Sequence, residues 1–213
     1  MPKLTMPFLR ISILFALVLS SCSTLHVVQD YTPIPLAKTA YDASYFSNSD
    51  VDYVYKANIS VYGNELSGIF IAKKINDTTH RVVFTTEFGN KLLDFEISKT
   101  NFKVNSIVEE LNRKLLITTL KTDFRLLLRN RFTVQEQFEN SKEIVYKSSD
   151  DGEFNYLFVA KSNGKLSKLL HTSKRKEKIS ISFISENNIF AEKVVIQHTN
   201  IKLRIEFNYL KNQ

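Results

Sequence analysis

Apolar and polar residues alternate along most of the chain after residue 50. Between Val51 and Val61, every second residue is apolar and its neighbours are mostly polar. This period of two is typical of β-strands with one buried face, because successive side chains point to opposite faces of a sheet. The same pattern predicts further strands over Leu66–Ile75, His80–Glu87, Lys91–Ser98, Phe102–Val104, Glu143–Lys147, Glu153–Lys161, Lys165–Thr172, Lys178–Ser185, Ala191–His198 and Ile201–Tyr209.

Pairs of turn-forming residues separate these strands. They are Gly63-Asn64, Asn76-Asp77, Gly89-Asn90, Asp151-Gly152, Asn163-Gly164 and Asn187-Asn188. Glycine and asparagine tolerate the positive φ angles of tight turns, and asparagine and aspartate side chains also bond to nearby backbone. Connections this short join antiparallel neighbours, since parallel strands need a longer crossover.

One stretch follows a helical period instead. Its apolar residues share one helical face: Leu116, Leu120, Phe124 and Leu127. The sequence Ser106-Ile107-Val108-Glu109 has the form of a capping box, so a helix is predicted from Ser106 to Arg129. Three threonines near its middle leave open whether this is one helix or two with a kink. An apolar stripe of this kind packs on a core more often than it binds a partner.

These elements predict a mainly β fold with a helical insertion, of the α+β class. In the last strand, the residues from Ile201 to Tyr209 place apolar side chains on one face and polar side chains on the other. Such a sheet has one solvated face and one that covers something apolar. We therefore expect a strongly curved antiparallel sheet that forms an open half-barrel around one or two helices.

The N-terminal residues predict export and a lipid anchor. The apolar run Ile11–Leu19 follows Arg10; it is too short to span a bilayer but has the length of a signal-peptide core. Leu19-Ser20-Ser21-Cys22 comes next and resembles the lipobox of bacterial lipoproteins, whose cysteine is lipidated and becomes the first residue. Residues 1–21 are thus predicted to be a lipoprotein signal peptide and Cys22 the lipidation site. An ordinary secretory signal with a chance cysteine is the alternative.

The segment from Cys22 to Asp50 is predicted to be a flexible tether. Pro33 and Pro35 disfavour both helix and sheet, with room only for a short helix over Leu36–Ala43. A flexible chain of this length spans roughly 30 Å, so the body, residues 51–213, is expected to float that far from the anchor. In the sorting rule that this N-terminus resembles, Ser23 rather than aspartate after the cysteine favours the outer membrane.

Composition narrows the possible functions. Hydrophobic residues make up 43% and aromatic residues 12% of the chain, as in ordinary globular proteins. Loss of the signal peptide removes Lys3 and Arg10 and lowers the formal charge from +7 to +5. This charge suits anionic headgroups but is equally common on soluble surfaces. Nothing resembles a nucleic-acid-binding module. With its single cysteine lipidated, the mature chain has no thiol for a disulfide.

No catalytic constellation stands out in the sequence. The four histidines, His26, His80, His171 and His198, are scattered without metal-ligand spacing. There is neither a nucleophile elbow nor a glycine loop for phosphates. Asp94 and Glu96 share one strand face beside Lys91 and Lys99, where a salt-bridged surface is favoured over an acid pair or a metal site. We expect no enzymatic activity, no cofactor and no metal.

Two exposed features have alternative interpretations. The basic run Lys174-Arg175-Lys176 falls at a predicted turn and is either solvated surface or a contact for phospholipid headgroups. Phe88 falls at the tip of a predicted hairpin, where an aromatic side chain stabilises little unless it packs or touches a partner. Phe88 could equally fold back onto the sheet edge.

The stretch Arg81-Val82-Val83-Phe84-Thr85-Thr86-Glu87-Phe88-Gly89-Asn90-Lys91-Leu92-Leu93-Asp94-Phe95 resembles the LolB family of outer-membrane lipoprotein receptors. In that family a strand runs into a loop with a protruding leucine just before a glycine, and Phe88 falls on the position of that leucine. The Lys56–Lys74 hairpin and the C-terminal strands are similar to the family as well. The chain departs from the family in having phenylalanine for the leucine, no tryptophans, and a short or absent helix before the barrel.

This resemblance implies an open β-barrel with a helical lid, whose apolar interior accepts the acyl chains of lipoproteins delivered by a soluble periplasmic LolA-like carrier. We therefore expect a lipid-anchored, periplasm-facing outer-membrane protein in which Phe88 contacts the membrane or the acyl chain. Candidate groove residues are Tyr55, Ile59, Phe70, Phe84, Phe95, Phe183 and Phe207. The alternative is a structural or accessory lipoprotein whose barrel is filled by its own helix. The sequence leaves open whether the groove is empty or filled.

Overall fold

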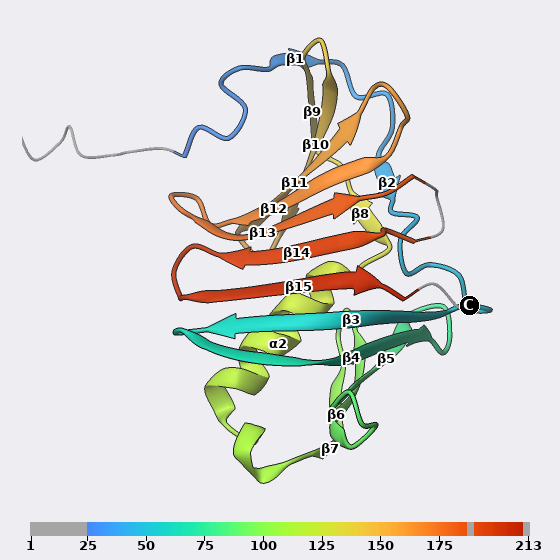
Figure 1. Cartoon of the computed structure of the whole chain (residues 1–213). Coiled ribbons are helices and arrows are strands. Elements are labelled where there is room, and N and C mark those ends of the chain that lie inside the picture. Colours follow the sequence, from blue (N-terminus) through green and yellow to red (C-terminus); the bar gives the residue numbers. More distant parts are fainter. Residues whose placement is uncertain (1–24, 187–189, 211–213) are drawn as a thin grey trace, which may run out of the picture.

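One large antiparallel sheet dominates the molecule (Figure 1). The structure is a computed structural model that describes residues 25–186 and 190–210. Thirteen strands follow the order β1-β9-β10-β11-β12-β13-β14-β15-β3-β4-β5-β6-β7, and β2 and β8 form a small second sheet. The strands are β1 (Thr32–Ile34), β2 (Ala40–Asp42), β3 (Asp52–Val61), β4 (Asn64–Lys74), β5 (Thr79–Thr85), β6 (Lys91–Ser98), β7 (Phe102–Ile107), β8 (Arg131–Thr133), β9 (Glu136–Glu139), β10 (Glu143–Asp150), β11 (Glu153–Ala160), β12 (Leu166–Thr172), β13 (Glu177–Ile184), β14 (Lys193–His198) and β15 (Leu203–Tyr209).

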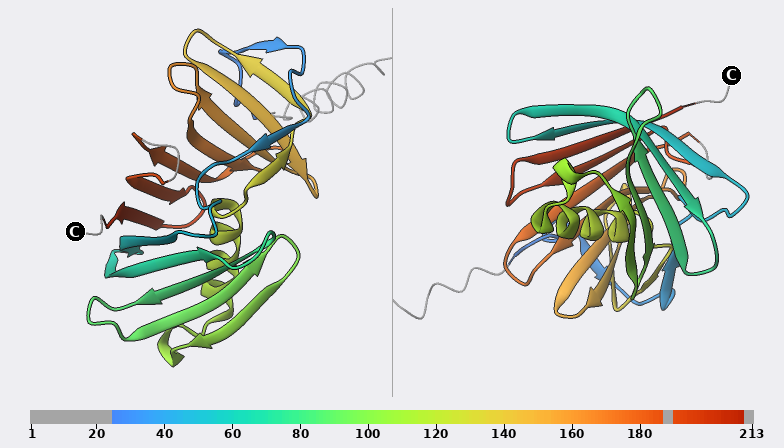
Figure 2. Two further views of the ribbon diagram at one scale, coloured as in Figure 1. Left: turned by 90° about the vertical axis from the view of Figure 1, so that its right-hand side faces the viewer. Right: turned by 90° about the horizontal axis from the view of Figure 1, so that it is seen from below.

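The sheet curves around a single α-helix. Helix α2 (Lys114–Leu127) lies in the hollow of the sheet, preceded by a 3-10 turn, η1 (Glu109–Leu111) (Figure 2, right). The strands β1 and β7 form the two edges of the large sheet, which therefore stays open. The expected mainly β fold with a curved antiparallel sheet around a helix is confirmed, and its helical part is small.

Every strand predicted from the alternation is present, with bounds that differ by a few residues. The alternation failed to predict β1, β2, β8 and β9. The first three have only three residues each, too few to show a period of two, and burial in β9 does not alternate. There, Gln137 and Phe138 are adjacent and both are buried. Two neighbouring strands and covered surfaces on both faces bury consecutive residues, which erases the period of two.

The predicted start of the helix is wrong. Ser106 belongs to β7, where it pairs with Asp94 across the ladder, and the helix begins only at Lys114. The strand pairing satisfies backbone groups that a capping box would otherwise have served. The helix runs without a break through its threonines, and the hydroxyls of Thr119 and Thr122 donate to carbonyls four residues earlier.

Residues 25–50 pack on the body, so the expected flexible tether is wrong for this part. Strand β1 pairs with β9, and β2 lies where a short helix over Leu36–Ala43 was expected. Tyr45 and Phe46 are buried in the core. Pro33 is tolerated because β1 is an edge strand and needs no second ladder of donors. The predicted signal peptide and Cys22 lie outside the described residues.

The sheet has an apolar cluster on each face. The larger one fills the concave side between the sheet and α2, and includes the helix residues Leu120 and Phe124. A smaller cluster lies on the convex side of β9–β12, built on Phe138, Val145, Tyr156, Phe158 and Leu170. Val27, Val28 and Tyr31 cover this second cluster, which explains why the N-terminal segment is held against the sheet.

Candidate functional site

The centre of the concave face is an aromatic layer contributed by three neighbouring strands. Tyr55 on β3, Phe70 on β4 and Phe207 on β15 lie with ring centroids 4.4 to 6.4 Å apart. Phe124 of α2 completes the layer, with its ring 5.3 Å from that of Phe70. All four side chains are buried. The helix therefore occupies the space that an open groove would offer.

The other groove candidates lie further along the same face. Phe84 on β5 lies across Gly68 of β4, where an added Cβ would come within 2.7 Å of the Phe84 Cζ atom and would also meet the Thr85 carbonyl. A glycine is thus required for the aromatic ring to lie flat at this crossing.

Phe95 and Phe183 pack on partners from different segments. The Phe95 ring lies 5.1 Å from that of Phe102 on β7, and the Phe183 ring stacks 5.1 Å from that of Tyr45. Both candidates are buried. The structure therefore places six of the seven candidates in the core, and only Ile59 is partly exposed.

The concave face becomes accessible toward the β3–β4 turn. Tyr55 and Ala57 are fully buried, whereas Ile59 and Val61, further along the same face of β3, are partly exposed. Leu66, which pairs with Ile59, is 38% exposed. These three side chains form an apolar mouth, defined here as Ile59, Val61 and Leu66. Leu66 was missed as a candidate, although its place next to the turn signal indicated an uncovered end.

The first turn of α2 lies at the same side of the molecule, at the left in Figure 1. Leu115 in this turn is 75% exposed and Leu116 is partly buried. The second half of the helix is the buried half, with Leu120, Asp123, Phe124, Leu126 and Leu127 against the sheet. The N-terminal half of α2 is therefore the part that binds the sheet least.

A buried polar pair joins α2 to the sheet. The Nε2 atom of His198 on β14 lies 2.9 and 3.0 Å from the two carboxylate oxygens of Asp123, and both side chains are almost wholly buried. Burial raises the pKa of Asp123, and the hydrogen bond with His198 opposes that shift. The pair fixes the position of the helix, because separating it would leave polar groups without partners in the core.

Two other histidines have structural partners. The His80 Nε2 atom lies 2.7 Å from the Phe46 carbonyl oxygen and ties the N-terminal segment to β5. His171 lies between Asn155 Oδ1, at 2.9 Å, and Glu153 Oε2, at 2.7 Å. Burial lowers the pKa of both histidines. Across residues 25–186 and 190–210, no group of three or more His, Cys, Asp or Glu side chains could hold a metal ion.

A cavity of about 520 Å³ lies beside the C-terminal end of α2. Its lining carries the cationic side chains of Lys99, Arg125, Arg129 and Arg131 and the carboxylates of Asp77, Asp150, Asp151 and Glu153. The groove candidates are not among its lining residues. The wall combines these charged groups with the apolar side chains of Ile97, Leu126 and Leu128. An acyl chain here would displace water from the charged groups, which opposes its binding.

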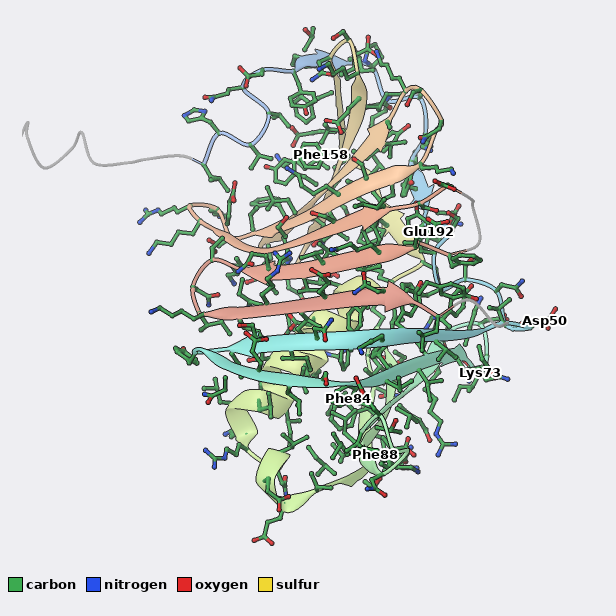
Figure 3. The ribbon with its side chains drawn as sticks, in the orientation of Figure 1. Asp50, Lys73, Phe84, Phe88, Phe158 and Glu192 are labelled. Atoms are coloured by element: carbon green, nitrogen blue, oxygen red, sulfur yellow. The ribbon has the colours of Figure 1, made fainter. Side chains whose placement is uncertain are left out.

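Phe88 projects into solvent from the β5–β6 turn. Its side chain is 96% exposed, so it does not fold back onto the sheet edge. The turn is ordered by backbone hydrogen bonds between Thr86 and Asn90, and Gly89 has a φ of 86°. An ion pair of 3.0 Å between Glu87 and Lys56, on the outer face of β3, holds the turn toward the convex side (Figure 3). The structure therefore separates Phe88 from the groove candidates on the concave side.

The convex face of β5–β7 carries a charged network around Asp94. Arg81 donates two hydrogen bonds to this carboxylate, at 2.7 and 3.0 Å, and Lys91 and Asn105 donate at 3.0 and 3.2 Å. Hydrogen bonds from Arg81, which outweigh the opposing effect of desolvation, hold the pKa of Asp94 well below its usual range. The predicted salt-bridged surface is confirmed, with Arg81 as a partner in place of Lys99.

The similarity of this chain to known proteins lies in its fold. The chain matches no protein-family model and no curated protein. Among solved structures, it is similar to a LolA superfamily protein from Nitrosomonas europaea, with a TM-score of 0.52 at 9% identity, over 78% of this chain and 87% of that chain. The fold is LolA-like. A putative outer membrane lipoprotein-sorting protein domain from Vibrio parahaemolyticus gives a TM-score of 0.45 at 8% identity, over 78% of this chain and 86% of that chain.

At these identities the likeness concerns the LolA-like fold alone. In residues 25–186 and 190–210, no helix has the length and apolar character needed to cross a membrane. The fold provides one surface suited to an apolar ligand, the concave face of the sheet, and helix α2 covers it. The end of that face near the β3–β4 turn carries the apolar mouth on β3 and β4 and, two strands away from β3 on β14, the Asp123–His198 pair.

Proposed function

We propose that this chain is a lipid-anchored, non-enzymatic protein of the periplasmic side of the outer membrane that binds acyl chains of lipoproteins, as LolB-like receptors do. The observation that carries the proposal is the concave face itself. A LolA-like sheet presents a continuous apolar surface there, and a single 14-residue helix covers it. The lipobox-like sequence ending at Cys22 supports the anchor, and Ser23 after the cysteine supports the outer-membrane location.

Binding requires the helix to move aside, because Phe124 and Leu120 fill the space against the sheet. An acyl chain that enters at the apolar mouth would take the place of α2, and its contacts with the concave face would replace those of the helix. Each methylene that leaves water contributes about 0.8 kcal/mol, so a long chain can replace the apolar contacts of a short helix. A bilayer buries the same methylenes equally well, which makes the onward transfer nearly neutral in free energy.

Delivery and release involve partners outside this chain. The proposed donor is a soluble LolA-like carrier, and the proposed acceptor is the outer membrane. Phe88 is suited to contact the incoming acyl chain or the bilayer, because it is almost fully exposed and contributes little to the core. No cofactor is required, since the transfer makes and breaks only non-covalent contacts.

A structural or accessory lipoprotein is the second candidate function. The filled interior favours it, because six groove candidates are buried and the cavity beside α2 is lined by charged residues instead. In that case α2 is a permanent part of the core, and the sheet serves as a rigid scaffold.

Photocrosslinking at the apolar mouth distinguishes the two functions. A photoreactive benzoylphenylalanine is placed at Ile59, on the concave side, or at Asn58, the exposed neighbour on the same strand. Cells are labelled with an alkyne fatty acid before irradiation. Acyl-chain binding predicts crosslinks to labelled lipoproteins from position 59 and none from position 58. If both positions give none, or if they give equal amounts, the accessory role is supported.

The anchor has its own test. Cys22→Ala removes the thiol that lipidation requires, so the variant should lose incorporation of the alkyne fatty acid. Wild-type protein should carry the label and fractionate with the outer membrane. Equal labelling of the two proteins would contradict the lipid anchor.

A further inference from the structure

Three turns lie side by side at one end of the strands of the large sheet, at the left in Figure 1. They are the β3–β4 turn at Tyr62-Gly63, the β14–β15 turn at 199–202 and the β12–β13 turn at 173–176. The Tyr62 backbone N–H donates to the Lys202 carbonyl at 2.9 Å. Thr199 joins the other two turns, since its N–H donates to the Lys178 carbonyl at 3.0 Å and its hydroxyl to the Glu177 carbonyl at 2.6 Å.

These turns carry exposed cations and one exposed aromatic residue. Lys174, Arg175, Lys176 and Lys202 are all exposed, and none of them forms an ion pair within the described part of the chain. Tyr62 is 63% exposed. Glu65 and Glu177 are carboxylates on the same turns, Asp151 lies in the adjacent β10–β11 turn, and Glu153 is paired with Lys178, so a small excess of positive charge remains. We define these four cations and Tyr62 as the basic edge.

The basic edge combines the two residue classes that favour a bilayer surface. Lysine and arginine are attracted by the phosphates of anionic lipids, and tyrosine partitions to the headgroup level with its ring inward and its hydroxyl toward water. The β12–β13 turn is held in place by Ser173, whose hydroxyl accepts hydrogen bonds from the backbone N–H groups of Arg175 and Lys176. The cations are therefore presented from an ordered turn.

The path of the N-terminal segment supports the same orientation. The described chain begins at this side of the molecule, beside the β12–β13 turn, in both views that show this edge (Figures 1 and 2, right). From there Val27 and Val28 pack on the convex-side cluster. Cys22 precedes Leu25 by three residues, which span at most about 11 Å. A lipid on Cys22 would therefore keep this side of the body at the bilayer.

We propose that the basic edge is a docking surface for an anionic phospholipid bilayer, and that the lipid on Cys22 and this edge together seat the body on the membrane. The body is then held against the headgroups, in contrast to one that floats on a long tether. The inference rests on the proposed lipid anchor and is independent of acyl-chain binding on the concave face. Phe88 lies on the convex side and is not part of this surface.

Fluorescence quenching measures the orientation directly. The lipidated chain has no other cysteine, so Asn200→Cys on the basic edge and Thr100→Cys in the β6–β7 turn can each be labelled with the fluorophore NBD. The full lipidated protein is reconstituted in phosphatidylcholine vesicles with about one third phosphatidylglycerol and headgroup-labelled spin-quencher lipid. We expect strong quenching at position 200 and several-fold less at position 100. Salt of about 1 M, which shortens the screening length to about 3 Å, should reduce the quenching at position 200.

Charge-matched variants identify the residues responsible. Lys174→Gln/Arg175→Gln/Lys176→Gln should reduce quenching at position 200 several-fold, while Lys99→Gln/Lys103→Gln/Lys142→Gln, with the same loss of charge, should leave it unchanged. Equal quenching at both labels, or equal effects of both triple variants, would overturn the inference and leave the anchor intact. Mass spectrometry of the purified chain separates the two failures, because an unacylated chain overturns the anchor and this inference together.

Discussion

Each face of the large sheet buries one aspartate, and the surroundings of the two carboxylates are opposite in kind. On the concave face, Asp123 of the helix is completely enclosed and has His198 as its ionisable partner. On the convex face, Asp94 is also enclosed, but by the side chains of Arg81 and Lys91, which themselves remain half exposed. The concave carboxylate is surrounded by hydrocarbon, whereas the convex one is surrounded by cations that keep their contact with water.

The pKa shifts of the two carboxylates differ in sign for this reason. Burial raises the pKa of Asp123, and hydrogen bonds from Arg81 lower that of Asp94. A buried pair gains little net stability because desolvation opposes its attraction, but breaking it is costly. The concave pair therefore specifies where α2 lies, while the convex network stabilises the sheet.

The largest effect is expected from the aromatic layer under the helix. Phe124→Ala should lower the free energy of unfolding by about 3–5 kcal/mol, because Phe124 is buried against Phe70 and its removal leaves a cavity. Phe88→Ala, which removes an equally large but exposed ring, is the control and should change it by less than about 0.5 kcal/mol. Chemical denaturation measures both. An unchanged Phe124→Ala midpoint would show that the helix is peripheral.

Breaking the concave pair should have the next largest effect. Asp123→Ala should cost about 2–3 kcal/mol, because His198 is left in the core without its acceptor. The double variant Asp123→Ala/His198→Ala should cost less than the sum of the single variants by about 1–2 kcal/mol, the coupling expected for contacting residues. Simple additivity of the two substitutions would mean that the pair does not fix the helix.

The convex network should contribute less, and with a defined pH dependence. Asp94→Asn should cost about 1–2 kcal/mol at neutral pH, since partly exposed partners weaken each charged hydrogen bond. The folded-state pKa of Asp94 lies below its unfolded value near 4, so this contribution is complete above that value. It should be lost as the pH falls further toward the lowered pKa.

Denaturation of wild type and Asp94→Asn at a series of acidic pH values checks this sign. The gap between the two proteins should narrow as the pH is lowered. Asp52→Asn provides the control, because its ion pair with Lys73 is solvent-exposed, shares no partner with Asp94 and should contribute less than about 0.5 kcal/mol. A gap that widens on acidification would contradict the assignment of Asp94 as a stabilising carboxylate.

The smallest effect on stability, with the largest effect on function, is expected at Phe88. Phe88→Glu should change the free energy of unfolding by less than about 0.5 kcal/mol, because the ring makes no part of the core. Transfer of lipoproteins to outer-membrane vesicles should fail, since a charge cannot enter an apolar contact without a partner. Phe88→Leu should transfer nearly normally. Unfolding of Phe88→Glu, or its transfer of cargo at the wild-type rate, would contradict the proposed role.

The sequence alone determined most of the strands, the turns between them and the place of the helical stripe, but not β1, β2, β8 or β9. A period of two reports which face of a strand is buried, whatever covers that face, so β3 to β6 and β10 to β15 could be predicted without their partners. The turn at Gly89-Asn90 followed from the sequence in the same way, whereas the structure decided that Phe88 projects from it into solvent. These are local properties, set by neighbours within a few residues.

Only the tertiary structure decided what covers each face. Tyr45 and Phe46 lie in a proline-containing segment that looks like a tether, yet Phe46 packs 4.9 Å from Tyr53 and contacts His80 through its carbonyl. In the same way, the groove is filled because Phe124 meets Phe70, 54 residues earlier in the chain. Contacts at such separations depend on how the whole sheet curves, and no local pattern of hydrophobic residues records that curvature.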